Sequence, residues 1–471
     1  MVWSGYLSRR TGAGVMGLHS IVFNLYGFAV TLAVAGIGLA VTRLVSEYEA
    51  ANDRPGSFAV VRRALLCVGA SGGGTALLLL LFARPLGCLL GDGATAPLVR
   101  VLSLPVFSLS VSAVFSGYFA ARRRAWINVV AGIAELFFRI LFTLRLLSPA
   151  PANEGDAVFR LLLGGGLAEA TSALLLVLFF LADRHGEKTR GGEAVTRRIL
   201  SISIPVALSG CLRAGLSTLG HLLIPFSLCR SGIDRATALA SYGTLAGMAL
   251  PVVLYPMAIL SSGAALLVPE FARLRGADDR AGTRALVGRA LSVTLAFSFG
   301  CFTVLFAFSA PLGTLLFGSS DAGRFISYLA PVVPVMFLDH ITDAALKGVG
   351  EQVAVMWINI ADSALTVLLI LVLLPRFGIV GYILMIALTE VFNFACSFRR
   401  LVRATGYVPA PLRVIPPLLF SLLALAFSRR CLTLGARSVG TLAVGGAAAL
   451  ALYLLPYLLL AHRTPKNLPR P

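Results

Sequence analysis

The chain has 471 residues, of which 58% are hydrophobic and 13% are charged, and its mean hydropathy is +0.88. These values exclude an ordinary soluble globular protein, in which about 25% of the residues are charged. The net charge of +19 would suggest a nucleic-acid partner in a soluble protein, but in so apolar a chain we expect no nucleic-acid binding, because the positions of the charges matter more than their sum.

Apolar stretches of about 20 residues recur along the whole chain, and each is long enough to cross a hydrocarbon core of about 30 Å as a helix. The ten-residue alternation of a membrane β-barrel is not found. We therefore predict an all-α polytopic membrane protein of about 13 spans. The predicted spans are 18–44, 64–83, 98–120, 126–147, 158–182, 199–227, 238–267, 290–316, 325–346, 353–374, 379–398, 412–428 and 438–461.

The chain carries no recognisable catalytic or cofactor motif. The seven cysteines are scattered without the paired spacing of a metal site or a disulfide framework. A Walker loop, a cluster of metal ligands and a nucleophile triad are also missing from the sequence. We expect a transporter that is not an enzyme and that needs no cofactor and no metal.

Basic residues alternate between loops. One set, made of every second loop, carries 25 of the 40 lysines and arginines, whereas the intervening loops carry 11. The richer set includes the loops at 122–124, 184–198, 273–289 and 399–413. By the positive-inside rule the richer set is cytoplasmic. The sequence therefore predicts a multi-pass protein of the cytoplasmic membrane with its C-terminus in the cytoplasm.

The sequence also contains an internal repeat. The run Phe82–Leu90 shares its phenylalanine, proline, glycine and three leucines with Phe308–Leu316, 226 residues later. Gly117 stands nine residues before Trp126-Ile-Asn, and Gly348 stands nine residues before Trp357-Ile-Asn. A weaker match, at an offset of 223, relates Glu47-Tyr48 to Glu270-Phe271.

The repeat predicts two six-helix lobes related by pseudo-twofold symmetry, followed by two C-terminal helices. The expected domains are an N-lobe at 1–182, a cytoplasmic linker at 183–198, a C-lobe at 199–401 and the two extra helices with the tail at 402–471. The start of the chain matches the tail of the first helix of the second lobe, so we expect the first helix of the N-lobe to be largely missing, through a misplaced start codon or a real truncation.

The repeat and several motifs resemble the MOP superfamily of exporters, especially its polysaccharide biosynthesis branch similar to stage V sporulation protein B. The motifs are Gly36-Ile-Gly-Leu-Ala with Arg43-Leu-Val-Ser-Glu, Ser116-Gly-Tyr-Phe, Ala240-Ser-Tyr-Gly, Leu267-Val-Pro-Glu and Leu374-Pro-Arg-Phe-Gly. The resemblance covers nearly the whole chain. It implies alternating access, in which two lobes rock around a central cavity, a mechanism suited to chains built from repeats.

Charges inside spans are costly and therefore mark candidate functional residues. Arg213 is predicted to lie near the middle of a helix that faces the cavity in the superfamily, where it could hold a lipid-linked pyrophosphate. His221 falls roughly on the same face, and Arg43 is expected at the cytoplasmic mouth. The structural alternatives are an ion pair or a water-filled kink for Arg213, a hydrogen-bonded core histidine for His221 and a positive-inside anchor for Arg43.

In the second half, Asp339, Asp343, Lys347 and Glu351 recur every four residues and form one stripe on a helix, with Asn359 and Asp362 on the next span. Their carboxylates could bind a proton or a sodium ion. The alternative, which we favour, is an Asp343–Lys347 ion pair that stabilises the lobe. Glu135 and Arg139 show the same spacing and are interpreted as a structural pair, and Glu169 and Glu390 stay unassigned.

Three functions are compatible with these features. The leading interpretation is a flippase that moves an undecaprenyl-linked saccharide or a peptidoglycan precursor, with membrane lipids as its surroundings. A MATE-type antiporter of organic cations is the first alternative, favoured by the acids of the second half. A scaffold for envelope biogenesis that transports nothing is the second.

Overall fold

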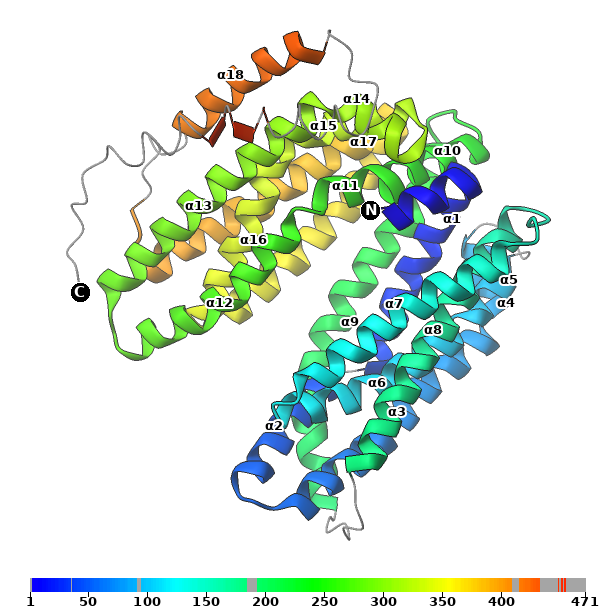
Figure 1. Ribbon diagram of the computed structural model, residues 1–471, viewed down its shortest axis with the longest axis vertical. Helices are drawn as coiled ribbons and strands as arrows, with labels where there is room; N and C mark the ends of the chain where they lie inside the picture. The colour runs from blue at the N-terminus through cyan, green and yellow to red at the C-terminus, as the bar shows by residue number, and fades with distance from the viewer. Residues whose placement is uncertain are drawn as a thin grey trace. The chain divides into compact units, whose positions relative to one another are not determined.

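The structure is a computed structural model that describes residues 2–34, 36–90, 95–183, 193–408 and 415–432, together with five positions between 448 and 454. In these ranges the regular structure is entirely helical, as predicted (Figure 1). The principal helices are α1 (Val2–Val34), α2 (Ile37–Ala50), α3 (Arg54–Leu81), α4 (Ala83–Leu90), α5 (Ala96–Val101), α6 (Ser103–Ala121), α7 (Ala125–Leu147), α8 (Glu154–Asp183), α9 (Glu193–Cys229), α10 (Arg235–Tyr242), α11 (Leu250–Leu254), α12 (Met257–Gly276), α13 (Arg280–Ala307), α14 (Ser309–Leu312), α15 (Ser320–Leu329), α16 (Val333–Gly348), α17 (Gln352–Thr405) and α18 (Ile415–Leu432). Two π-helical segments, η2 (Gly243–Ala249) and η3 (Gly313–Phe317), and one 3₁₀ turn, η4 (Ala330–Val332), connect some of them.

The chain divides into two compact units. One unit, here called the N-unit, is Leu18–Leu223; the other, the C-unit, combines Met1–Gly17 with Ile224–Pro471. The lobe boundaries expected from the repeat stay a prediction.

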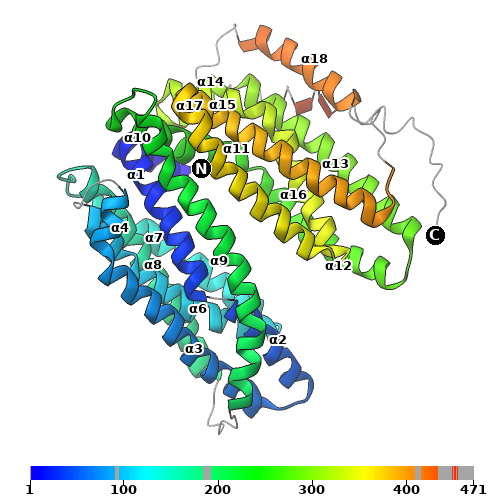
Figure 2. The same cartoon turned by 180° about the vertical axis from the view of Figure 1, so that it is seen from behind.

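The N-unit is a bundle in which α3, α6, α7 and α8 pack side by side (Figure 1). Its core at one end is aromatic, because the rings of Phe58, Phe115 and Tyr118 all lie within 6 Å of the ring of Phe180. The first helix and α9 run alongside each other in the same unit, where Thr218 Oγ1 donates a 3.2 Å hydrogen bond to the carbonyl of Asn24 (Figure 2). Small residues permit this approach, since a Cβ on Gly215 would already touch Phe28 at 3.4 Å.

The C-unit is built around α12, α13, α16 and α17, with α18 packed on α13 (Figure 1). The segment labelled α17 covers 54 residues and consists of two helices that meet at Gly378, where φ is 55° and ψ is −134°. The two helices lie side by side, since Asn393 on the second contacts Asn359 on the first. Pro375 lies just before Gly378 and removes one backbone donor. The two predicted spans 353–374 and 379–398 are therefore the two arms of α17.

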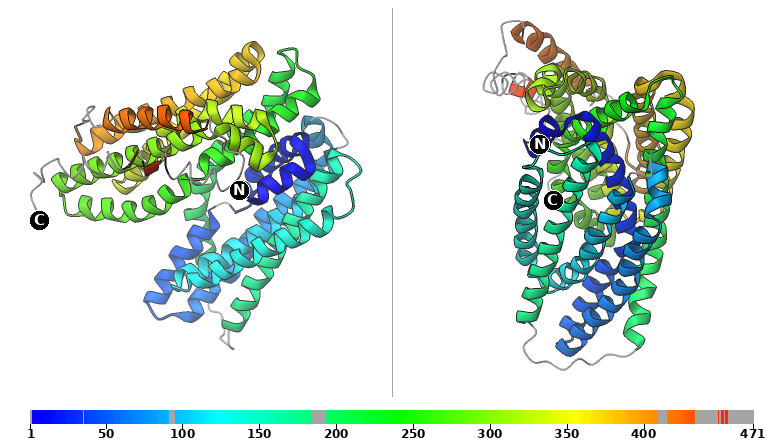
Figure 3. Two further views of the ribbon diagram at one scale, coloured as in Figure 1. Left: turned by 45° about the horizontal axis from the view of Figure 1, so that its top comes forward. Right: turned by 90° about the vertical axis from the view of Figure 1, so that its right-hand side faces the viewer.

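Within the C-unit, the N-terminal segment packs through glycines on the part that begins at Ile224. A Cβ on Gly17 would lie 2.2 Å from the carbonyl oxygen of Leu239, and one on Gly243 would lie 2.1 Å from that of Ala13. Arg9 adds hydrogen bonds to the backbone carbonyls at the end of η3, including one of 3.2 Å from Nε to Leu316. Gly12, with φ of 85°, breaks α1 within this segment, and the first turns lie at an angle to those that follow (Figure 3).

Among the described residues, 11 helices are long and apolar enough to cross a membrane. They cover the predicted spans up to residue 398 in large part, with two differences. The span predicted at 290–316 extends past the end of α13 at Ala307 into α14 and η3. The single span predicted at 238–267 is interrupted at Tyr255 and Pro256, which separate α11 from α12. The span predicted at 412–428 corresponds to α18, and most of the one at 438–461 lies outside the described residues.

The internal repeat is visible in backbone geometry. The turn before α3 places Asn52 at φ 56° and lets Asp53 accept a hydrogen bond from the Gly56 amide; the turn before α13 does the same with Asp278 at φ 49° and Asp279 with Gly282. These turns are 226 residues apart, the offset of the proline motif. The weaker sequence match at 223 was therefore out of register.

We expect Gly378→Ala to lower the free energy of unfolding by about 1–3 kcal/mol, because a Cβ disfavours positive φ. The measurement is the melting temperature of the detergent-purified protein. The matched control is Gly165→Ala in α8, where nothing lies within 4 Å of the added Cβ and alanine should stabilise the helix by up to about 1 kcal/mol. Equal melting temperatures for the two variants would contradict the expectation that position 378 requires glycine.

Candidate functional site

A polar cluster lies inside the C-unit between α16 and α17. At its centre Asp343, only 9% exposed, accepts hydrogen bonds from Asn359 Nδ2 at 3.2 Å and from Ser397 Oγ at 3.0 Å. Asn393 Nδ2 then donates to Asn359 Oδ1 at 3.5 Å. Both oxygens of Asp343 therefore have partners, as a buried carboxylate requires.

Two further acids of this cluster are less well satisfied. One buried carboxylate oxygen of Asp339 and one of Asp362 have no hydrogen-bond partner among the described residues. The charges of Asp343, Glu390 and Asp362 all act on Asp339. Asp339 therefore lies among like charges and lacks a hydrogen-bond donor for one of its oxygens in the described part of the chain.

These acids do not converge on one point. In the described part of the chain no three histidine, cysteine or acidic side chains are placed to hold a metal ion.

The favoured Asp343–Lys347 ion pair is wrong for the described structure. Lys347 is exposed near the end of α16, whereas the carboxylate of Asp343 points to Asn359 and Ser397 on α17. Four-residue spacing placed the two on one face of the helix, but the hydrogen-bond donors of α17 satisfy the acid instead. Glu351, at the end of the same stripe, pairs with Arg400 at 2.7 Å.

The two N-unit residues predicted on α9 lie on that helix as expected. Arg213 is exposed near the middle of the 37-residue helix and has no ion pair or hydrogen bond among the residues that the structure describes. The ion-pair alternative for Arg213 is thus not supported within that part of the chain. His221 is half-buried two turns further along the helix.

Arg43 is not brought close to Arg213. It forms an i,i+4 ion pair with Glu47, with 3.3 Å between Nε and Oε1, and Glu47 also pairs with Arg198 near the start of α9. Arg198 and Arg213 are separated by 15 residues, which is about 22 Å along a helix. Arg43 therefore lies at the charged end of the N-unit, near the start of α9, whereas Arg213 lies near the middle of that helix.

A second polar group lies in the N-unit, between α7 and α8. Glu169 on α8 is only 5% exposed and lies within electrostatic reach of Glu135 and Arg139 on α7. The predicted pair of Glu135 and Arg139 is confirmed as an ion pair. The proximity of Glu169 depends on the packing of α7 on α8, which residue spacing within one helix does not reveal.

Comparison with known families decides the affiliation. The profile described as "Polysaccharide biosynthesis protein" matches residues 1–275, more than half of the chain, and the MatE profile matches residues 224–372. The chain belongs to the polysaccharide biosynthesis protein family. The predicted affiliation with the MOP exporter superfamily is thereby confirmed.

Individual relatives agree with this family. The chain is 22% identical over 386 residues to "Stage V sporulation protein B" of Bacillus subtilis, covering 80% of this chain and 74% of that protein. It is also 22% identical to the "Uncharacterized membrane protein YabM" of the same organism, over 77% of this chain and 69% of the relative.

Two solved structures share the fold. The lipid II flippase MurJ in an inward closed conformation superposes with a TM-score of 0.73 at 11% identity, covering 98% of this chain and 96% of that one. An inward-facing MATE multidrug transporter of the MOP superfamily gives 0.70 at 13% identity, with 87% and 95% covered. This member of the polysaccharide biosynthesis family is thus a multi-pass α-helical membrane protein and a transporter of the MOP superfamily.

The cluster predicts different effects for its two aspartates. Asp343→Leu should lower the free energy of unfolding by about 1–3 kcal/mol, since it leaves the donors of Asn359 and Ser397 without their acceptor. Asp339→Leu should cost less or stabilise, because it removes a charge that neighbouring acids repel. Melting temperatures of both variants in one detergent measure the difference, and a larger loss for Asp339→Leu would contradict this assignment.

Proposed function

We propose that this protein is a flippase that moves an undecaprenyl-linked saccharide, such as a peptidoglycan precursor, between the leaflets of the cytoplasmic membrane by alternating access. The observation that carries this proposal is Arg213, a cation exposed at membrane depth with no protein counter-charge among the described residues. Such a charge is costly in lipid, and it is maintained where it meets water or an anionic ligand.

The chemistry of the ligand follows from the guanidinium. Arginine presents several N–H donors in a rigid fork that matches the oxygens of phosphate bidentately. A lipid-linked sugar carries such a pyrophosphate next to its isoprenoid tail. Similarity to a family named for polysaccharide biosynthesis, and to the fold of a lipid II flippase, supports this class of substrate.

The C-unit supplies a candidate for energy coupling. Asp339 is an acid in a partly buried cluster of like charges, and we assign it the binding of a proton whose release accompanies the change of state. Asp343 and Asn359 position this cluster, and Asp362 is its second titratable member. By the loop charges, the C-terminus is assigned to the cytoplasm.

The second candidate is a MATE-type antiporter of organic cations. The acids of the C-unit favour it, since a cationic drug needs carboxylates in its path. A cavity presenting Arg213 opposes it, because like charges repel the substrate. The third candidate, a scaffold without transport, requires no exposed charge at membrane depth.

The test is a leaflet-translocation assay in proteoliposomes with a fluorescent lipid-linked saccharide. Arg213→Ala should slow translocation at least about tenfold, and Arg213→Lys should restore part of the rate. Arg230→Ala, at the end of the same helical segment, removes an equal charge as the matched control and should leave the rate within about twofold.

Equal rates for the wild-type protein and Arg213→Ala would reject the role of this residue. Two outcomes would reject the flippase. Proton-driven uptake of a cationic dye, without flipping, would assign the chain to the antiporters. Neither activity in a correctly folded protein would favour the scaffold.

Coupling is tested separately with Asp339→Asn. The neutral side chain cannot release a proton, so we expect translocation to lose its dependence on an imposed pH gradient while substrate binding is maintained. Asp278→Asn, an exposed acid in a loop, is the control. A gradient dependence that survives in Asp339→Asn would contradict the assignment.

A further inference from the structure

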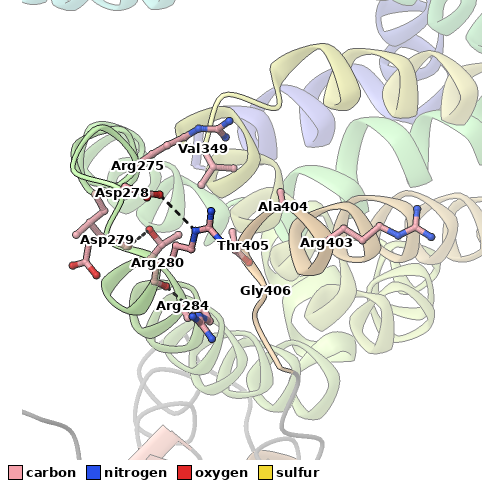
Figure 4. Close-up of a pocket in the computed structure, with 12 residues that line it drawn as sticks. Arg275, Asp278, Asp279, Arg280, Arg284, Val349, Arg403, Ala404, Thr405 and Gly406 are labelled. Carbon is pink, nitrogen blue, oxygen red and sulfur yellow. Dashed lines mark hydrogen bonds and ion pairs between the residues drawn. The ribbon is translucent and has the colours of Figure 1, made fainter.

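A pocket of about 460 Å³ lies in the C-unit where several helices end. It is bounded by the turn between α12 and α13, by Val349 after α16 and by the last turn of α17 at Arg403–Gly406 (Figure 4). The four helices that meet here are membrane spans by length and composition. The pocket therefore lies at the level of the membrane surface, where lipid headgroups are.

Arginines dominate its lining. Arg275, Arg280, Arg284 and Arg403 contribute to the wall, against Asp278 and Asp279 (Figure 4). Asp279 is occupied as the N-cap of α13, accepting a 2.8 Å hydrogen bond from the Gly282 amide. Asp278 has only a 3.5 Å contact with Arg280, and both side chains are at least 80% exposed.

The remaining cations have no acidic partner in the described part of the chain. The guanidinium groups of Arg275, Arg284 and Arg403 form no ion pair there, and Arg284 Nε donates only to the carbonyl of Arg280. Arg403 extends along α17, away from Arg280 (Figure 4). Arg275, Arg280 and Arg284 thus form a cationic rim supplied by a single turn of the chain.

The other repeat shows that this pocket is not a general property of the fold. In the N-unit the corresponding positions are Phe58, five residues after the capping aspartate, and Tyr118, which follows Gly117 of the repeated motif. Both are buried, with ring centroids 6.1 Å apart, and the Tyr118 hydroxyl donates to Asp183 at 2.6 Å. In the C-unit their counterparts are Arg284 and Val349, so a charged and a small residue replace two rings and leave space.

We infer that this pocket binds the phosphate headgroup of an anionic glycerophospholipid, with Arg275, Arg280 and Arg284 as the ligand-binding residues. Basic pockets between spans are typical sites for such headgroups, and arginine recognises phosphate with paired hydrogen bonds. Lipid is favoured over a free phosphate because the pocket opens at the ends of spans, where acyl chains can remain in the bilayer. This inference is independent of the substrate of transport.

The experiment measures binding of dioleoylphosphatidylglycerol to the purified full-length protein by native mass spectrometry. The principal variant is Arg284→Phe with Val349→Tyr, which places the two rings of the N-unit into the C-unit. We expect its affinity for phosphatidylglycerol to fall at least about tenfold. The triple variant Arg275→Gln, Arg280→Gln and Arg284→Gln should show a similar loss and a weaker dependence on salt.

Controls separate this site from general attraction to a basic protein. Arg62→Gln, Arg63→Gln and Arg197→Gln together remove three charges from the N-unit and should change affinity less than threefold. Dioleoylphosphatidylcholine should not compete. Melting temperatures in zwitterionic micelles verify that each variant is folded; if the ring-filling pair is not, the triple glutamine variant decides.

Two results would overturn the inference. One is wild-type affinity for phosphatidylglycerol in the folded ring-filling or glutamine variants. The other is equally tight binding of glycerol 3-phosphate, which carries the phosphate without acyl chains and would identify a soluble anion as the occupant.

Discussion

A polar group at membrane depth has to find its partner inside the protein, and this constraint explains most of the packing in both units. Asp343 is tolerated because Asn359 and Ser397 of α17 donate to it. Glu135 is tolerated because Arg139 lies one turn away. Arg213 and one oxygen of Asp339 differ, because neither has a partner among the described residues. At such positions a ligand or a proton would provide the missing partner.

Much of the fold was predictable, because membrane spans are long and uniformly apolar and because the chain repeats itself. The prediction was less accurate where backbone geometry matters. The two spans predicted at 353–374 and 379–398 are the two arms of α17 on either side of Gly378, whereas the one span predicted at 238–267 divides at Tyr255 and Pro256. Hydropathy averages over such positions, since a kink changes direction without changing polarity.

The candidate site was predictable in composition but not in its bonds. Helical spacing put Asp339 and Asp343 on one stripe and suggested Lys347 as the partner. Which partner Asp343 takes is decided by Ser397, 54 residues away, and a contact of this range depends on how α17 folds back. The same limit explains Glu169, whose neighbours lie on a different helix, whereas Glu135 and Arg139 are neighbours within one helix and were predicted correctly.

An ion pair between a turn and the end of a following helix is present in both units, although the residues that form it differ. In the N-unit the turn after α6 supplies Arg122 and Arg124, which pair with Asp183 at the end of α8. In the C-unit the turn after α16 supplies Glu351, which pairs with Arg400 near the end of α17. Both units therefore have an ion pair between this turn and the end of the following helix, but the acidic and basic partners are exchanged.

The reversed polarity has a consequence for the surface of the C-unit. Cations near the C-terminus of a helix interact favourably with its dipole, whereas an acid there does not. With Arg400 in the role of Asp183, the last turns of α17 carry Arg399, Arg400 and Arg403 and no acid, and the single acid of the turn, Glu351, is already paired. The inverted pair therefore leaves no acid of α17 for Arg403, which forms no ion pair among the described residues and lines the neighbouring pocket together with Arg275 and Arg284.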